Sequence, residues 1–280
     1  MLISGSIGIT ILKKDKKIVY LLADDHSNTI YCEHIEKDIK NKNHSSIRDY
    51  IRNEIKRGNQ ILLEEIPRGD FELEELWPDS PHTQDLKNLF LKDKDIKGID
   101  IRPYLIPFSI ETIDNDKKLN NIPISEYLSR FDNFFNLKGK FYFEMLIPTI
   151  DKLVLSNDEL IKNMRIIRSE YDNIKSFTLK DKGNIKYYMD NHPEIFEKIN
   201  NLSSQIMEFY TILNIFTEHS KSVIHTGLYH SNNILNLLTD LYNFKIVFKN
   251  GVNNFPPKQS KISSCIKLPE LKQLLSININ

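Results

Sequence analysis

The stretch Ser222-Val-Ile-His-Thr-Gly-Leu-Tyr-His-Ser-Asn-Asn-Ile-Leu235 decides the fold. Its short apolar run predicts a β-strand that carries His225 at its end, and a Gly-containing turn then leads to His230. A strand, a tight turn and a helix start would place the two imidazoles in one small space. Ligands of open α/β sheets bind in the crevice beyond the carboxyl ends of the strands, so both histidines are candidates for binding or catalysis. The alternative is a pair of core histidines satisfied by the backbone.

The residues after the turn predict an amphipathic helix. Ser231 and Asn232 are good N-caps, and leucines at helical spacing follow at Leu235, Leu238 and Leu241. The amino end of a helix disfavours positive charge. This position therefore predicts a neutral His230 that can act as a base or a metal ligand.

The N-terminal part of the chain predicts a hairpin that ends in a polar cluster. Residues 7–12 and 18–23 are β-rich runs joined by a Lys-rich turn, and Asp24, Asp25 and His26 follow the second run. A histidine at the carboxyl end of an apolar strand is a candidate for chemistry. The alternative is a surface histidine in a polar turn.

Residues 60–68 predict another strand, with Glu64 and Glu65 at its far end. Before it, Ser46-Ile-Arg-Asp49 resembles a capping box that opens a helix. Strand, helix and strand form a βαβ unit with parallel neighbouring strands, so His26 and one of the two glutamates should face the same crevice. Only one glutamate can point into it, because side chains alternate along a strand. The alternatives are a solvated strand end, an interaction with a helix dipole, or pairing with Arg68.

Two further groups are supporting candidates. Residues 98–103 predict a short strand with Asp100 and Arg102 at its end, a pair that is either structural or placed behind the reacting groups. Tyr229 could donate a hydrogen bond to an oxyanion, although packing is the favoured interpretation.

The remaining pattern predicts an α/β fold: a central, mostly parallel sheet with flanking helices and a helical insertion. Residues 1–103 and 220–280 would form the α/β core, and residues 104–219 a helical insertion that covers the crevice. Within the insertion we expect long helices at 157–174 and 193–216. A last strand at 244–248 and a C-terminal helix from residue 269 would complete the core.

Composition narrows the possible functions. The chain has 280 residues, with 38 basic and 38 acidic side chains, so its net charge argues for neither nucleic acid nor an anionic membrane surface. Cys32 and Cys265 match no ligand spacing, which argues against a disulfide framework or zinc knuckle and favours a reducing compartment. The sequence shows neither a signal peptide nor an apolar run of membrane-spanning length, so we expect a cytoplasmic protein.

Several common chemistries lack their motifs in this sequence. It contains neither a G-x-x-x-x-G-K-[ST] nor a G-x-G-x-x-G phosphate-binding loop. It also lacks the G-x-S-x-G nucleophile elbow and the H-E-x-x-H zinc helix.

The order of a strand-end histidine, a strand-end glutamate and a late G-x-x-H resembles one known superfamily. It contains the erythromycin esterases (EreA type), the ChaN-like haem-binding proteins, and the TraB and TIKI-type metalloproteases. Ala23-Asp-Asp-His26 corresponds to its G-E-x-H motif with alanine and aspartate substituted, Leu62-Leu-Glu64 to its apolar-apolar-Glu pattern, and Gly227-Leu-Tyr-His230 to its late G-x-x-H. Gly98-Ile-Asp-Ile-Arg102 is similar to another strand end of the superfamily. The resemblance covers roughly residues 18–103 and 220–250.

This resemblance implies a hydrolase of ester or peptide bonds, acting on a small molecule or a peptide. His26, Glu64 and His230 would be the catalytic groups, or the ligands of a divalent metal ion. Supporting roles would fall to His225, Asp25, Glu65, Arg68, Asp100, Arg102 and Tyr229. The alternatives are a binding protein for a haem-like ligand and a scaffold that has lost its chemistry. The sequence leaves the substrate, the metal and the oligomeric state open.

Overall fold

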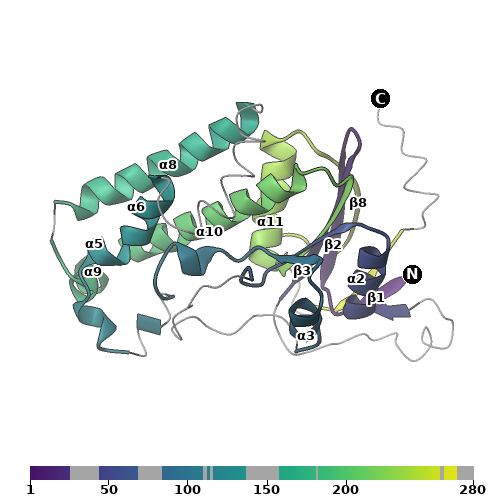
Figure 1. The fold of residues 1–280 in the computed structure, drawn as a ribbon, viewed down its shortest axis with the longest axis horizontal. Coiled ribbons are helices and arrows are strands. Elements are labelled where there is room, and N and C mark those ends of the chain that lie inside the picture. Colours follow the sequence, from purple (N-terminus) through teal and green to yellow (C-terminus); the bar gives the residue numbers. More distant parts are fainter. Residues whose placement is uncertain are drawn as a thin grey trace. The chain divides into compact units, whose positions relative to one another are not determined.

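The computed structural model describes residues 1–25, 44–68, 84–109, 112–113, 116–136, 158–180, 182–258 and 262–269 (Figure 1). The chain divides into two compact units. Unit 1 takes the described residues of Met1–Glu65, Ser80–Ile99 and Glu218–Asn280, and unit 2 those of Ile66–Asp79 and Asp100–Thr217. Two boundaries of the units fall at 99/100 and 217/218, where the sequence predicts 103/104 and 219/220. A third falls at 65/66, within the predicted core, because the described residues after Glu65 belong to unit 2.

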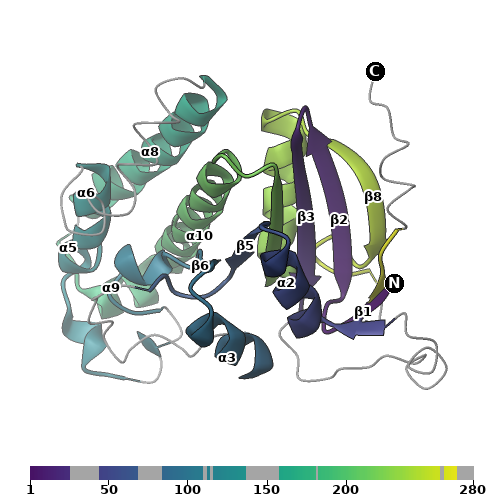
Figure 2. The same ribbon diagram turned by 45° about the vertical axis from the view of Figure 1, so that its right-hand side comes forward.

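Unit 1 is built on a six-stranded sheet in the order β6-β5-β7-β3-β2-β8, of which Figure 2 gives a clear view. The first four strands are mutually parallel, whereas β2 is antiparallel to both β3 and β8. The chain thus has the α/β fold that the sequence predicts. The strands are β6 Ile96–Gly98, β5 Gln60–Leu63, β7 Lys221–Gly227, β3 Lys17–Asp24, β2 Gly8–Lys14 and β8 Lys245–Gly251.

The strand order corrects one expectation from the sequence. β3 and β5 are parallel, as predicted, but they are not neighbours, because β7 pairs with both of them. Asp24 pairs with Gly227, and Leu63 pairs with both His225 and Gly98. The carboxyl ends of the four parallel strands therefore lie at one edge of the sheet, although β7 separates the two strands of the predicted βαβ unit.

Helices pack on both faces of this sheet. Residues of α2 (Ile47–Lys56) and α3 (Gln84–Lys92) share a core cluster with Leu22 of β3. Ala23 instead packs with Leu228 of α11 (Leu228–Asn236). Successive side chains of a strand point to opposite faces, so α11 covers the face away from α2 and α3.

Local sequence signals explain where α2 begins. The Ser46 hydroxyl accepts a hydrogen bond from the Asp49 backbone N–H at 3.1 Å, which confirms the predicted N-cap. A small sheet in the order β4-β1-β9 lies in the same unit, with β4 His44–Ser46, β1 Leu2–Ser4 and β9 Cys265–Lys267. The strand predicted at 244–248 is confirmed as β8, but it is not the last one, because β9 follows it. The predicted helix from residue 269 lies outside the described residues.

The start of α11 differs from the sequence-based prediction. The strand β7 continues through Gly227 and the helix begins at Leu228, so Gly227 is the N-cap and the capping roles predicted for Ser231 and Asn232 are wrong. His230 and Ser231 consequently lie inside the first turn of the helix. A turn of π-helix, Leu237–Leu241, follows α11.

Unit 2 is helical in its described residues. The helices α8 (Asp158–Thr178) and α10 (Pro193–Ile215) pack against each other and confirm the two long helices predicted from the sequence (Figure 1). Pro193 occupies the first position of α10, where its missing N–H costs nothing. The shorter helices are η2 Arg102–Tyr104, η3 Leu119–Asn121, α5 Ile124–Tyr127, α6 Ser129–Phe135 and α9 Ile185–Asn191.

Two further features bear on the expectations from composition. Among the described residues, none of the helices has both the length and the apolar character that crossing a membrane requires. Cys265 is disulfide-bonded, which corrects the prediction against a disulfide, and the other cysteine, Cys32, lies outside the described residues.

Candidate functional site

The candidate site lies where β5 and β7 end at the carboxyl edge of the sheet. Glu64 directly follows β5, and its backbone N–H donates a hydrogen bond to the His225 carbonyl at 3.1 Å. This bond extends the pairing of β5 with β7 by one residue. The Glu64 side chain therefore starts level with the last residues of β7, just before α11 begins.

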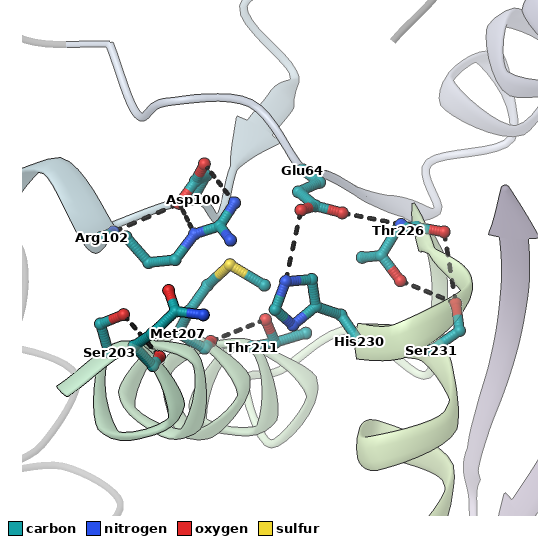
Figure 3. A network of polar contacts seen from close by, with 11 residues as sticks. Glu64, Asp100, Arg102, Ser203, Met207, Thr211, Thr226, His230 and Ser231 are labelled. Carbon is teal, nitrogen blue, oxygen red and sulfur yellow. Dashed lines mark hydrogen bonds and ion pairs between the residues drawn. The ribbon is translucent and has the colours of Figure 1, made fainter. Parts of the chain in front are cut away.

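The Glu64 carboxylate is buried and fixed by the main chain. Its Oε2 accepts a hydrogen bond from the backbone N–H of Gly227 at 2.7 Å (Figure 3). Gly227 is the N-cap of α11, so this N–H belongs to the positive end of the helix. A backbone donor of this kind stabilises the ionised form of a carboxylate.

The second carboxylate oxygen of Glu64 faces His230. Its Oε1 lies 3.5 Å from the Nε2 atom of His230, and both side chains are buried (Figure 3). His230 is the third residue of α11. The carboxylate thus contacts the backbone of the helix N-cap with one oxygen and the imidazole in the first helical turn with the other.

A pair of hydroxyl groups holds this first turn to the sheet. Thr226 Oγ1 and Ser231 Oγ lie 2.7 Å apart (Figure 3). Ser231 Oγ also donates to the Leu22 carbonyl at 3.3 Å. Ser231 is adjacent to His230 in the chain, so the pair fixes the helix where the imidazole branches from it. The sequence analysis missed this role, because it placed Ser231 at the helix cap.

His225 is placed differently from His230. Its register partners Leu22 and Leu63 belong to the core cluster beneath α2 and α3. Alternation along β7 puts its fully buried side chain on that same face, whereas Thr226 faces α11. The expectation that His225 and His230 share one space is therefore wrong.

The other unit 1 candidates lie at the same sheet edge. Asp24 ends β3 and is buried, and Asp25 follows it half-buried. His26, the next residue, lies outside the described residues. Glu65 is buried, and its N–H donates to the Leu63 carbonyl at 2.7 Å, so the chain turns directly after Glu64. Tyr229 precedes His230, and the residue is 37% exposed.

Three candidates belong to unit 2. Asp100 and Arg102 form a two-pronged ion pair, with Nε to Oδ1 at 2.8 Å and Nη2 to Oδ2 at 2.9 Å (Figure 3). The pKa of nearby Tyr104 is raised to about 12, mainly because the side chain is buried and to a lesser extent because of the negative charge of Asp100. The protonated Tyr104 hydroxyl donates to the Pro67 carbonyl, next to the exposed Arg68.

The residues at the sheet edge offer two of the ligands a metal ion would need. Among the described residues, no group of three His, Cys, Asp or Glu side chains is placed to hold an ion. The 3.5 Å between Glu64 Oε1 and His230 Nε2 nevertheless suits two ligands of one tetrahedral ion, which lie about 3.3 Å apart at metal–ligand distances of about 2.0–2.1 Å.

Comparison of the chain with protein-family models, with curated proteins and with solved structures finds no match. The class that can be stated is therefore structural: an α/β protein with a buried Glu–His pair at the carboxyl edge of its sheet.

Proposed function

We propose that the protein is a hydrolase of ester or peptide bonds that uses Glu64 and His230, with His26 as the third group. The observation that carries the proposal is the buried carboxylate of Glu64, which lies 3.5 Å from His230 and is anchored by Gly227. A buried acid beside a histidine at the carboxyl edge of parallel strands is an arrangement typical of catalytic sites.

The Glu–His pair supports general-base catalysis. If the Nε2 atom of His230 carries its proton toward Glu64, the Nδ1 atom keeps a lone pair that can accept a proton from water. The imidazolium that then forms is stabilised by the adjacent carboxylate. Proton transfer of this type accelerates hydrolysis by about 10²- to 10⁴-fold.

A divalent metal ion is the second route to the same reaction. Glu64 and His230 would hold the ion together with His26, and the ion would supply a bound water of lowered pKa. The N–H of Gly227 would then orient the carboxylate from behind, as groups behind metal ligands do. Both routes agree with the resemblance to the erythromycin esterase, ChaN-like and TraB–TIKI superfamily, which also supports a small-molecule or peptide substrate.

Turnover by the purified protein tests the proposal. We expect wild-type protein to hydrolyse members of a panel of 4-nitrophenyl esters and fluorogenic peptides. Replacing His230 by alanine should lower kcat/KM at least about 100-fold, because the base or ligand is lost. The matched control is His219→Ala, which removes an exposed histidine of the same unit and should keep full activity. Unchanged turnover in the His230 variant would refute the proposal.

Metal and haem measurements separate the alternatives. Elemental analysis of the purified protein, and turnover after treatment with a chelator, decide between the two hydrolytic routes. A Soret band that forms on haem addition and is lost in His230→Ala, without turnover, would instead identify a ligand-binding protein. Neither turnover nor ligand binding would leave an inactive scaffold.

A cytoplasmic location also belongs to the proposal. The disulfide of Cys265 is an observation against it, because disulfides persist mainly in oxidising compartments. Fractionation of cells that express the protein, followed by immunoblotting, tests the location. Recovery of the protein from an oxidising compartment would contradict the cytoplasmic location.

A further inference from the structure

Three aromatic rings form a series that runs from the candidate site to the surface of unit 1. The rings of His230 and Tyr229 are 5.2 Å apart, and those of Tyr229 and Phe255 are 5.3 Å apart, both pairs edge to face. Exposure rises along the series from 6% at His230 to 37% at Tyr229 and 49% at Phe255. The buried imidazole is therefore continuous with an accessible aromatic surface.

The chain holds Phe255 in this position. Phe255 lies in the segment after β8, and its backbone N–H donates to the Asn232 side-chain oxygen of α11 at 3.3 Å. The helix that carries His230 thus also anchors the outer ring. Edge-to-face packing of Tyr229 on Phe255 adds a second link between the same two segments.

The segments that carry these rings lack formal charge. Neither 222–239 nor 250–257 contains Asp, Glu, Lys or Arg, in a chain that is 27% charged. A charged group on a ligand would find no complementary side chain in these segments, whereas an apolar ring would bury its surface against the two aromatic faces and edges. The chemistry of this surface therefore favours an uncharged aromatic ligand.

We infer that Tyr229 and Phe255 bind an uncharged aromatic group of the substrate, next to the bond that is presented to His230. This inference rests on the proposed hydrolase function, because only an enzyme has a substrate. Binding of the aromatic group can be measured without turnover. The inference assigns Tyr229 a ring-stacking role, in place of the oxyanion donor considered from the sequence.

Binding of uncleavable ketones tests the inference. The probe is 4-phenylbutan-2-one, which matches benzyl acetate with a methylene in place of the ester oxygen. It is compared with butan-2-one, which lacks the ring, and with 4-(4-carboxyphenyl)butan-2-one, which carries a charge. Saturation-transfer NMR and calorimetry on the full chain should show that the phenyl ketone binds at least about 10-fold more tightly than either.

Matched variants assign the binding to the two rings. Phe255→Ala and Tyr229→Ala should each weaken phenyl ketone binding about 5- to 10-fold, while Tyr229→Phe, which keeps the ring, should retain it. The control is Leu91→Ala, which removes an exposed apolar side chain of α3 and should leave binding unchanged. Circular dichroism spectra of all variants check that they fold.

The outcomes separate this inference from the proposed function. Ring-dependent binding without hydrolysis of benzyl acetate supports the aromatic surface and counts against the hydrolase. If esters with and without an aromatic group are hydrolysed equally well and Phe255→Ala leaves KM unchanged, the inferred binding of an aromatic group is refuted while the hydrolase function stands. Equal binding of the charged and neutral phenyl ketones would also overturn the inferred binding.

Discussion

Glu64 and Glu65 are neighbours in the chain, and the carboxylate of Glu64 lies 3.5 Å from the imidazole of His230. The Leu62-Leu63-Glu64 pattern favoured Glu64 from sequence, and alternation along β5 gives the physical reason. The partner of the carboxylate could not be predicted in the same way, because the Gly227 N–H is a main-chain group that any residue supplies. For His225 the prediction from sequence was wrong. Its closeness to His230 in the chain suggested one shared site, whereas His225 lies on the sheet face covered by α2 and α3, and His230 lies in α11 on the other face.

Ser231 gives a prediction at the scale of a single residue. Ser231→Ala removes the hydroxyl that joins the first turn of α11 to Thr226 and Leu22. We expect the free energy of unfolding to fall by about 1 kcal/mol, because a buried hydroxyl loses its partner. We also expect kcat to fall about 10-fold with little change in KM, since His230 is less well positioned.

Thr226→Ser is the control for this prediction, because it keeps the hydroxyl pair and should keep kcat. Denaturant unfolding and steady-state kinetics are the measurements. A Ser231→Ala variant with the stability loss and an unchanged kcat would show that the hydroxyl pair serves folding alone.

At the scale of elements, sequence patterns predicted which segments form helices and strands better than they predicted which strands pair with each other. The hairpin, the Ser46 N-cap of α2 and both long helices of unit 2 follow from local periodicity and capping residues, which act within a few positions. The insertion of β7 between β3 and β5 did not follow, because it depends on pairing between residues far apart in the chain.

A buried ionic network that joins α2 to β7 gives the prediction at this scale. Glu54 of α2 is almost fully buried and accepts hydrogen bonds from Arg57, Asn59 and Lys221, each at 2.6 Å. Glu54→Ala leaves the Lys221 ammonium without its carboxylate. We expect unfolding free energy to fall by about 3–5 kcal/mol, the usual cost of breaking a buried pair from one side.

Arg57→Ala is the matched control, because the Arg57 side chain is largely exposed and its loss should cost no more than about 1 kcal/mol. The pKa of Tyr20 offers a second measurement. This pKa is raised to about 12, mainly because Tyr20 is buried and also because of the negative charge of Glu54. Titration of the tyrosine should therefore give a lower pKa for Tyr20 in Glu54→Ala. Equal stability losses in the two variants would contradict the importance of the buried pair.

At the scale of the whole molecule, the α/β class was predictable because alternating strand and helix patterns leave few ways to cover both faces of a sheet. The function rests on the site alone, because a fold of this class hosts many chemistries. Two of the three predicted catalytic groups, Glu64 and His230, lie together, and the third, His26, lies outside the described residues.

The most direct test of the account is a double-mutant cycle on kcat/KM with Glu64→Gln and His230→Gln. Glutamine keeps the size of the glutamate side chain while removing its charge. Because the two groups act as a unit, we expect each single variant to lose at least about 100-fold and the double variant to lose no more than the worse single one. Losses that multiply in the double variant, or a single variant with wild-type kcat/KM, would contradict the claim that Glu64 and His230 form one catalytic site.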